Sequence, residues 1–438
     1  MSNGAVQRTK GRGASGLPAL ETEPGAVPPI DEDDRTVTKG ILVVCFLQIA
    51  LGCFYQTCTI PTARQYAEEL NAPAHFDAYT VGAVSIGSAV IQPLYRWLLS
   101  KSFAATMHFQ LVCIQLGSIL YSLAQVAGKM ELLVVGRLLG GFGASQYPIY
   151  QFIAESVGKN HRSKVISLVS GFGKSFGFAL GPIFAACVAN VDFQLGDMVV
   201  DKETNPGWMV ALLCVVQIAL VVWVFPREGS KLIGKEKLSA DLPESAAPNF
   251  MSLKAKVFHY FALSYVVLMI ALSNAFLSAW QLAATKVIQL TFEWSVQWSA
   301  VLVGGICFTP AFVTPLLGRL SYKFQDRTIL LFSCLAQLLS CVLLFDYGTP
   351  IPYLIGGLLI FNAMTSEVMF SLSLSTKVAF LSEVDVVMSV IGLSTISRLP
   401  GFMLGSYLAM DELAGTFLAG SLLSVLGACV FFKKLVPT

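Results

Sequence analysis

The most constraining feature of this chain is a series of apolar stretches, each about 20 residues long and nearly free of charge. A helix needs about 20 mostly apolar residues to cross a bilayer. Only 13% of the residues are charged and 55% are hydrophobic, whereas soluble chains carry about 25% charged residues. We therefore expect an all-α integral membrane protein with twelve transmembrane helices. The expected spans are 40–60, 79–99, 104–127, 131–154, 165–189, 207–226, 257–280, 296–317, 328–347, 351–373, 387–410 and 412–432.

Polar segments divide these spans into two sets of six. Residues 1–38 have no apolar run and are expected to form a disordered cytosolic tail, and residues 433–438 are expected to form a short cytosolic tail. The polar segment 227–256 is expected to link two six-helix bundles, 39–226 and 257–432. Most of the 29 Lys and Arg residues fall on the side of the tails and the linker. Because basic residues favour the cytosolic side, both termini and the linker are predicted to be cytosolic.

A short pattern that begins with a basic residue occurs once in each half. The segments 174–181 and 398–405 both have a glycine three residues and seven residues after the cation. At about 1.5 Å per helical residue, both cations lie roughly 14–17 Å from the cytosolic face. A cation at that depth is costly and marks a functional site by default, the alternative being a structural ion pair. The residues of the repeat are Lys174, Gly177, Gly181, Arg398, Gly401 and Gly405.

The glycines of this repeat predict close helix contacts, because glycines four residues apart let helix backbones approach. Gly181 is followed by Pro182, which loosens the helix by removing a backbone donor. We expect the fifth span to pack tightly here against its neighbour in the other half. Two readings stay open: packing alone, or a contact that also slides as the halves move.

Three motifs resemble those of the major facilitator superfamily, and the likeness covers about 40–432. The segment 318–327 is similar to that family's cytosolic motif, with Gly318, Lys323 and Arg327 in motif positions, although Tyr322 and Gln325 replace its Asp and Gly. A second match, 137–143, resembles the motif of the fourth helix and puts Arg137 in its arginine position. A third, 177–182, resembles the glycine–proline motif of the fifth helix. The resemblance implies two pseudo-symmetric six-helix bundles and alternating access.

The end of the fourth span and the fifth span resemble the lysosomal and vacuolar branch of that family. This branch includes the ceroid-lipofuscinosis lysosomal protein and vacuolar phosphate transporters with an SPX domain. No SPX domain fits in the tail 1–38. The resemblance implies a monomer in a lysosomal or vacuolar membrane.

Other polar residues within the spans are candidates for a substrate or coupling site. Glu367 is the deep acid, and we consider a pair with Arg398 that leaves Lys174 unmatched. Arg137 is expected either to take part in coupling, to brace its helix or to bind a nearby carbonyl. The resemblance places a cavity between the first, fourth, seventh and tenth helices. Polar residues on those helices are Gln48, Gln56, Gln146, Tyr147, Tyr150, Gln151, Asn274, Asn362 and Ser366, of which Gln146, Tyr147, Asn274 and Asn362 are the chosen candidates.

The balance of buried charge favours a secondary transporter of a small anionic solute, because three cations (Arg137, Lys174 and Arg398) face one deep acid. Proton coupling through Glu367 is a further expectation. Three alternatives stay open: a proton-coupled exporter of amphipathic compounds, an anion channel on the same fold, and a membrane scaffold. No nucleophile elbow, phosphate-binding loop, metal spacing or nucleic-acid-binding pattern is present, so we expect no enzyme, cofactor, metal or nucleic-acid partner.

Overall fold

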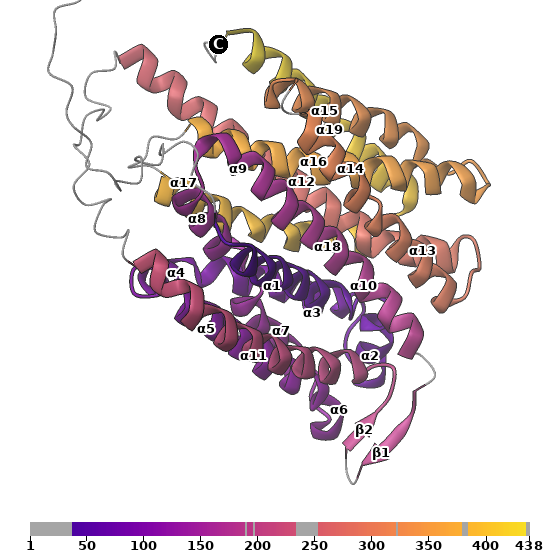
Figure 1. The fold of residues 1–438 in the computed structure, drawn as a ribbon. Helices are drawn as coiled ribbons and strands as arrows, with labels where there is room; N and C mark the ends of the chain where they lie inside the picture. The colour runs from indigo at the N-terminus through magenta and orange to yellow at the C-terminus, as the bar shows by residue number, and fades with distance from the viewer. Residues whose placement is uncertain are drawn as a thin grey trace, which may run out of the picture.

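A computed structural model of the chain describes residues 37–188, 191–195, 198–233, 253–320, 323–378 and 384–434. These residues are almost entirely helical (Figure 1). Most of the predicted tail 1–38, of the linker 227–256 and of the tail 433–438 lies outside the described residues. The ends of the linker segment are helical, because α11 and α12 run into it from either side.

The first half, drawn from indigo to magenta in Figure 1, is made of helices and one β-hairpin. Its elements are α1 (Lys39–Thr57), α2 (Ala63–Glu69), α3 (Phe76–Val90), α4 (Gln92–Leu99), α5 (Phe103–Ser122), α6 (Ala124–Ala127), α7 (Glu131–Gly143), α8 (Tyr147–Ser156), α9 (Lys159–Ile166), a π-helical segment (Ser167–Phe172), α10 (Gly173–Val188), β1 (Phe193–Leu195), β2 (Met198–Val200) and α11 (Asn205–Ile233).

The second half, drawn from salmon through orange to yellow, consists of helices joined by short loops in its described residues. Its elements are α12 (Leu253–Leu290), α13 (Val296–Phe308), α14 (Pro310–Leu320), α15 (Asp326–Leu343), α16 (Pro350–Val378), α17 (Val384–Ser394), a 3₁₀ turn (Thr395–Ser397), α18 (Arg398–Tyr407) and α19 (Met410–Lys434).

Eight helical stretches of the described chain are long and apolar enough to cross a membrane. Three other predicted spans, 79–99, 131–154 and 387–410, are each built from shorter helices in succession. The last predicted span, 412–432, falls within α19. The all-α membrane fold expected from the apolar runs is therefore present, with more breaks than the runs suggest.

Proline explains where several spans break. Pro93 and Pro148 stand in the first turns of α4 and α8, and Pro310 begins α14. Proline has no N–H and its ring clashes with the carbonyl four residues earlier, so a helix ends before it and a new one starts. Hydropathy alone does not register these breaks, because the flanking residues remain apolar.

Three elements outside the predicted spans lie at the ends of the helices away from the termini. The short helix α2 follows α1, and β1 pairs with β2 as an antiparallel hairpin in which Phe193 faces Val200. In addition, α12 continues past the predicted end at 280 to Leu290. Its last turns are held by packing, since Ala283, Ala284 and neighbouring residues are buried.

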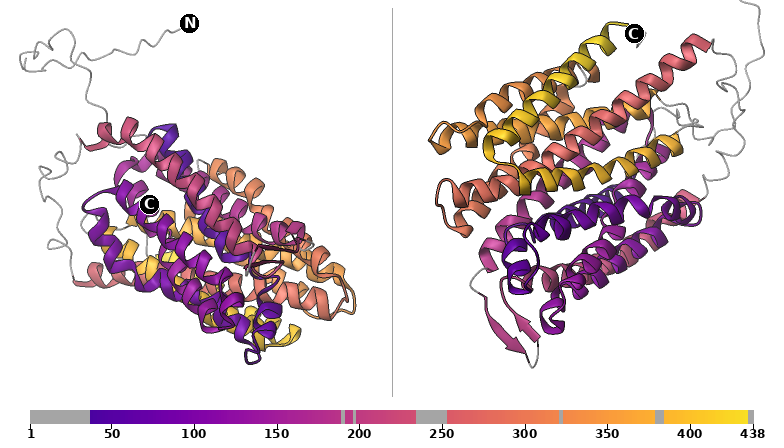
Figure 2. Two further views of the ribbon diagram at one scale, coloured as in Figure 1. Left: turned by 90° about the horizontal axis from the view of Figure 1, so that it is seen from below. Right: turned by 180° about the vertical axis from the view of Figure 1, so that it is seen from behind.

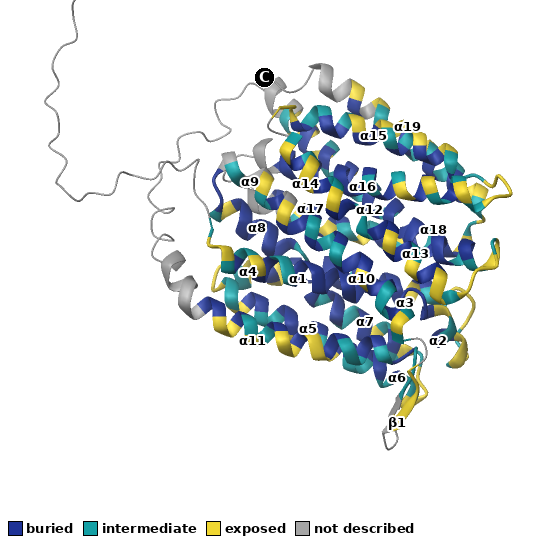
Figure 3. Cartoon of the chain, turned by 45° about the vertical axis from the view of Figure 1, so that its right-hand side comes forward, coloured by how far each residue is buried: buried dark blue, intermediate teal, exposed yellow. Residues whose placement is uncertain are grey.

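The two halves lie side by side in Figure 1 and in the right-hand view of Figure 2. They touch where α10 packs on α13 and where α3 packs on α18. Gly304 of α13 permits the first approach, because a Cβ there would lie 2.9 Å from the carbonyl oxygen of Ala179 in α10. Figure 3 shows the buried residues in the interior and the exposed ones along the outer helices. On α11 the outward residues are apolar, with Leu212 and Trp223 about 60% exposed, as expected for a surface that faces lipid.

Candidate functional site

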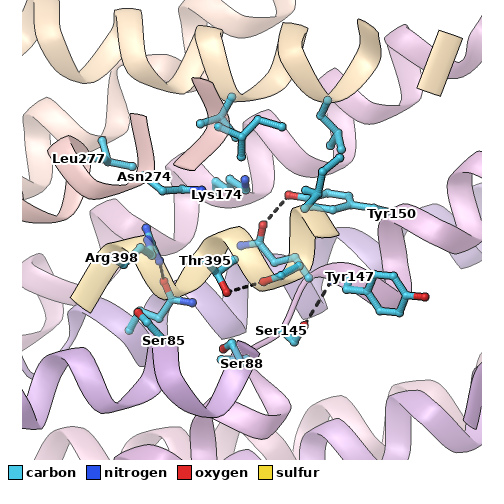
Figure 4. Close-up of a pocket in the computed structure, with 18 of the residues that line it drawn as sticks. Ser85, Ser88, Ser145, Tyr147, Tyr150, Lys174, Asn274, Leu277, Thr395 and Arg398 are labelled. Atoms are coloured by element: carbon cyan, nitrogen blue, oxygen red, sulfur yellow. Dashed lines mark hydrogen bonds between the residues drawn. The ribbon is translucent and has the colours of Figure 1, made fainter. Parts of the chain in front are cut away.

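A cavity of about 60 Å³ lies between the two halves (Figure 4). Helices from both halves contribute to its wall, including α3 and α10 on one side and α12, α16 and α18 on the other. Among the described residues that line it, two are basic and none is acidic. Its polar lining residues are Gln56, Ser85, Ser88, Ser145, Gln146, Tyr147, Tyr150, Lys174, Asn274, Thr365, Thr395 and Arg398.

Arg398, the first residue of α18, reaches this cavity from the second half and is only 7% exposed. Its Nη1 donates a hydrogen bond to the side-chain oxygen of Gln56 in α1. Its guanidinium carbon lies 5.3 Å from the ring centroid of Phe178 in α10, a cation–π contact. Its Nε is buried and has no hydrogen-bond partner in the described structure. Groups of the first half therefore hold this cation without neutralising it.

Lys174 reaches the cavity from the first half, in the first turn of α10. Its Nζ lies 5.4 Å from the ring centroid of Tyr150. The phenol of Tyr150 is itself held, since its oxygen lies 2.8 Å from Ser170 Oγ and donates to the side-chain oxygen of Gln146. Within the described part of the chain, no carboxylate forms an ion pair with Lys174 or Arg398. The two cations predicted from the repeat thus face one cavity.

Each cation follows a segment that departs from α-helical geometry. The π-helical segment Ser167–Phe172 ends just before α10, and the 3₁₀ turn Thr395–Ser397 ends where Arg398 begins α18. π-helical segments of this kind occur frequently at functional sites. The irregular turns break both helices at equivalent points of the repeat, beside the charge.

The glycines of the repeat lie at close helix contacts, but not at the contact that was expected. A Cβ on Gly177 would lie 2.2 Å from the carbonyl oxygen of Ala50 in α1, and one on Gly181 would lie 2.1 Å from Thr57 Oγ1. In the second half, a Cβ on Gly401 would lie 2.1 Å from the carbonyl oxygen of Ala275 in α12, and Gly405 packs on Ala279 of α12 in the same way. The fifth span does pack on the other half, because α10 contacts α13, but the glycines of the repeat do not make that contact: they join helices within one half. Pro182 continues α10 directly after this contact.

Arg137 of α7 is fully buried and lies outside the cavity lining. Its Nη1 donates to the carbonyl oxygen of Tyr55 (2.5 Å) and its Nη2 to that of Gln56 (3.0 Å), while its guanidinium carbon stands 4.4 Å from the Tyr55 ring centroid. Both carbonyls belong to the last turn of α1, where a helix leaves its carbonyl groups without internal partners. The guanidinium thus caps α1, in agreement with the carbonyl alternative for this residue. The C-terminal end of the helix dipole also favours a cation there.

Glu367 does not form the pair with Arg398 that the sequence suggested. Its Oε2 accepts a hydrogen bond from Ser273 Oγ (2.6 Å), and the Gln337 side chain lies against the same carboxylate, to which its amide donates in the orientation that satisfies both groups. The carboxylate is 1% exposed and points into the second half, between α12 and α15. The sequence gives depth along α16 but not the direction in which a side chain points, and Glu367 contacts side chains of α12 and α15 rather than Arg398.

Of the other polar candidates, Gln146, Tyr147 and Asn274 line the cavity and Asn362 does not. The Asn362 amide instead donates to Thr309 Oγ1 (2.6 Å) and to the Leu358 carbonyl (2.7 Å). The hydroxyl of Tyr147 accepts from Ser389 Oγ across the halves (3.3 Å).

The sequence interpretation missed several hydroxyl residues of the wall, above all Ser85 and Ser88 of α3. Their spacing of three residues puts both on one helix face, and this was the available signal.

The cytosolic motif lies outside the cavity lining. Gly318 is in the last turns of α14, and Lys323 is exposed. Arg327 Nε donates to the side-chain oxygen of Gln325. Next to it, Asp326 begins α15 and accepts from Ser373 Oγ of α16 (3.0 Å). The conformational role of this segment stays a prediction.

Three acidic residues away from the cavity come close together: Glu69, Asp201 and Glu203 place carboxylate oxygens within 4.8 Å of one another. Two of the three side chains have partners of their own. Asp201 accepts from the backbone N–H groups of Glu203 (3.1 Å) and Thr204 (2.9 Å), and Lys202 Nζ lies 3.2 Å from Glu203 Oε1. Burial, with the nearby Glu69, raises the pKa of Glu203 to about 7.

Comparison with known proteins gives consistent matches. The family model described as Major Facilitator Superfamily matches residues 45–406. An SPX domain-containing membrane protein of Arabidopsis thaliana is 22% identical over 419 residues, which is 82% of this chain and 56% of the relative. Another from Arabidopsis is 25% identical over 203 residues, 45% of this chain and 28% of that protein. These alignments span less than two thirds of each relative's length.

Solved structures match over nearly the whole chain. The xylose transporter XylE from E. coli, in a partially occluded inward-open conformation, has a TM-score of 0.64 at 15% identity and covers 91% of this chain and 98% of XylE. A D-xylose-proton symporter has a TM-score of 0.63 at the same identity, with the same coverage. At this identity the likeness establishes the shared fold alone.

Proposed function

The chain belongs to the major facilitator superfamily, and on that premise we propose that it transports a small anion across its membrane by alternating access. The fold supports the coarser part of this statement, secondary transport by a multi-pass membrane protein. The anionic substrate is our own inference from the cavity between the halves.

The observation that carries the proposal is the uncompensated positive charge of this cavity. Lys174 and Arg398 both line it, and none of the described lining residues is acidic. A buried charge without a partner of opposite sign is strongly unfavourable. An anion bound between the two cations relieves this cost, and does so more effectively in a low-dielectric cavity than in water.

The size of the cavity favours a small substrate. One water needs about 10–15 Å³ of such space, so about 60 Å³ accommodates a few waters or a small inorganic anion. Pockets for drug-sized ligands are roughly 300–1,000 Å³, which disfavours the amphipathic compounds of the exporter alternative. The hydroxyl group of Ser85 and the amide of Asn274 can supply hydrogen-bond donors to anion oxygens.

Movement between the halves would expose this cavity to one side and then the other. The contacts that join the halves, α10 with α13 and α3 with α18, flank the cavity and are the surfaces expected to rearrange. The glycine contacts of α10 with α1 and of α18 with α12 lie within each half and would travel with it.

We assign proton coupling, as part of the proposal, to Glu367. Its carboxylate is buried and is held by a hydroxyl and an amide rather than by a cation. It does not line the cavity, so a proton there would act through the packing of α16, which also forms part of the cavity wall. The lysosomal or vacuolar membrane and a monomeric state are proposed from the resemblance to that branch.

Uptake by the purified protein in liposomes tests the proposal. Radiolabelled phosphate, sulfate and chloride would be offered with and without a pH gradient, and we expect saturable uptake of at least one of them. The Lys174→Gln protein, compared at equal reconstitution, should take up the same anion with weaker affinity. Uptake of none of the three anions would contradict the proposal, and a current far above transporter turnover would favour the channel alternative.

A further inference from the structure

The side chain of Gln56 occupies a position where the proposed anion would be bound. Gln56 lies in the last turn of α1, is 9% exposed and lines the cavity. Its side-chain oxygen accepts the hydrogen bond from Arg398 Nη1. Within the described residues, the Arg398 guanidinium makes no other hydrogen bond. The bond to Gln56 connects the second half of the chain to the first.

The backbone of Gln56 is fixed by a second buried arginine. Arg137 Nη2 donates to the Gln56 carbonyl oxygen at 3.0 Å, and Arg137 Nη1 donates to the carbonyl of Tyr55. The Tyr55 hydroxyl in turn donates to the carbonyl oxygen of Gly136 (3.1 Å), next to Arg137 in α7. This reciprocal pair of contacts anchors the end of α1 to α7. The amide oxygen of Gln56 is therefore presented to the cavity from a backbone that is held in place.

We propose that Gln56 is a built-in substitute for the transported anion, and that the anion must displace its amide oxygen from Arg398 in order to bind. This inference rests on the anion site proposed above and adds the residue that sets its affinity. An amide oxygen satisfies an arginine donor without neutralising its charge, whereas an anionic oxygen forms a stronger hydrogen bond and also neutralises that charge. Without an anion, Arg398 is hydrogen-bonded to Gln56. When an anion binds, this bond between the two halves is replaced by a bond between Arg398 and the substrate.

This exchange relates occupancy to movement. When Gln56 holds Arg398, α1 of the first half is bonded to α18 of the second. An anion that takes over Arg398 releases α1 and leaves the halves linked through the substrate and through contacts such as that of Tyr147 with Ser389. Gln56 is therefore a positioning residue, which acts on the substrate through Arg398.

Two substitutions of Gln56 should move anion affinity in opposite directions. Gln56→Leu removes the competing acceptor, and the apparent dissociation constant for the anion should fall by about tenfold, the value of one hydrogen bond to a charged group. Gln56→Glu supplies a tethered carboxylate at the same place, and the dissociation constant should rise by at least tenfold. A purely structural role would weaken binding or expression in both variants and would not produce opposite signs.

Gln48 offers a matched control, because it is a glutamine of the same helix, 3% exposed, that does not line the cavity. Gln48→Leu should leave the anion affinity unchanged. Binding would be followed by the thermal stabilisation of the purified protein during titration with inorganic phosphate, sulfate and chloride, which also reports whether each variant is folded. If Gln56→Leu fails to fold, Gln56→Asn, whose shorter amide withdraws from Arg398 while the backbone carbonyl stays, provides the same test.

The outcomes separate this inference from the proposed function. Anion binding by the wild type together with unchanged affinity in the folded Gln56 variants would overturn the role of Gln56 and leave the anion site standing. Absence of binding by the wild type to all three anions would overturn both. In the Arg398→Gln protein, Gln56→Leu should produce no further gain in affinity, and an undiminished gain there would show that Gln56 does not act through Arg398.

Discussion

The close helix contacts at Gly177 and Gly401 predict that a single added methyl group lowers the stability of the protein. In Gly177→Ala, the new Cβ would lie 2.2 Å from the carbonyl oxygen of Ala50 and 2.6 Å from the Cβ of Cys53. Neither atom is the end of a flexible side chain, so α10 and α1 must move apart to admit the methyl group. Gly401→Ala meets the same obstacle at the carbonyl of Ala275 in α12.

The magnitude follows from two opposing effects. Overpacking a close contact costs typically 1–3 kcal/mol, while replacing glycine by alanine within a helix gains roughly 0.5–1 kcal/mol. Gly305 of α13 and Gly415 of α19 provide the control, because nothing lies within 4 Å of a Cβ added at either position. Gly305→Ala and Gly415→Ala should be neutral or slightly stabilising. Gly177→Ala and Gly401→Ala should therefore be less stable than these controls by about 1–3 kcal/mol.

Thermal unfolding of the four alanine variants, followed by size-exclusion chromatography after heating, would measure this difference. The expected order is a lower melting temperature for the two contact glycines than for the two open ones. Because the contacts lie within each half, anion affinity of the protein that remains folded should change little. Equal melting temperatures for all four variants would refute the close packing of α10 on α1 and of α18 on α12.

Further predictions concern charge, pH and topology. Lys174→Gln and Arg398→Gln should each weaken anion uptake at little cost in stability, and the double variant should abolish uptake. If Lys174→Gln takes up the anion with unchanged affinity and rate, the anion site is wrong and the repeat reflects only gene duplication. Glu367→Gln should remove the pH dependence of transport in liposomes while the protein still reaches its membrane, and a normal pH profile would leave Glu367 as a structural acid. The pKa of Glu203 is raised to about 7 in the folded protein, above its value in the unfolded chain. Protonated Glu203 therefore contributes stability that is fully present below the unfolded-state pKa and is lost as the pH rises through 7. Glu203→Gln, which carries no charge, should raise the melting temperature at pH 8 more than at pH 4. Epitope tags at the N-terminus and within 234–252 should both be accessible from the cytosol, and a protected internal tag would contradict the predicted topology.

The fold could be predicted because bilayer thickness sets the length of an apolar helix, whatever its detailed sequence. The breaks within spans depend on positions such as Pro93 and Pro148, which an average over 20 residues conceals. The extension of α12 to Leu290 depends on tertiary packing at its last turns, which periodicity does not describe.

The site was predictable to the extent that charge is rare in a membrane. Lys174 and Arg398 stand out because any intramembrane cation is costly. Ser85 and Ser88 do not stand out, because a serine hydroxyl in a helix can bond a carbonyl, as Ser88 Oγ does to Gly141 (2.8 Å). The predicted pairing of Glu367 with Arg398 was wrong, because the depth of a residue along a helix does not fix the direction in which its side chain points.

Lys174 and Arg398 occupy equivalent positions of the repeat, but their surroundings differ. Arg398 is tied across the halves to Gln56, whereas Lys174 is half-buried over the Tyr150 ring without a carboxylate partner in the described structure. If both were structural, each would need an acid to offset a desolvation cost of several kcal/mol, and the cavity wall provides none among its described residues. An anion that contacts both cations offsets the two costs at once.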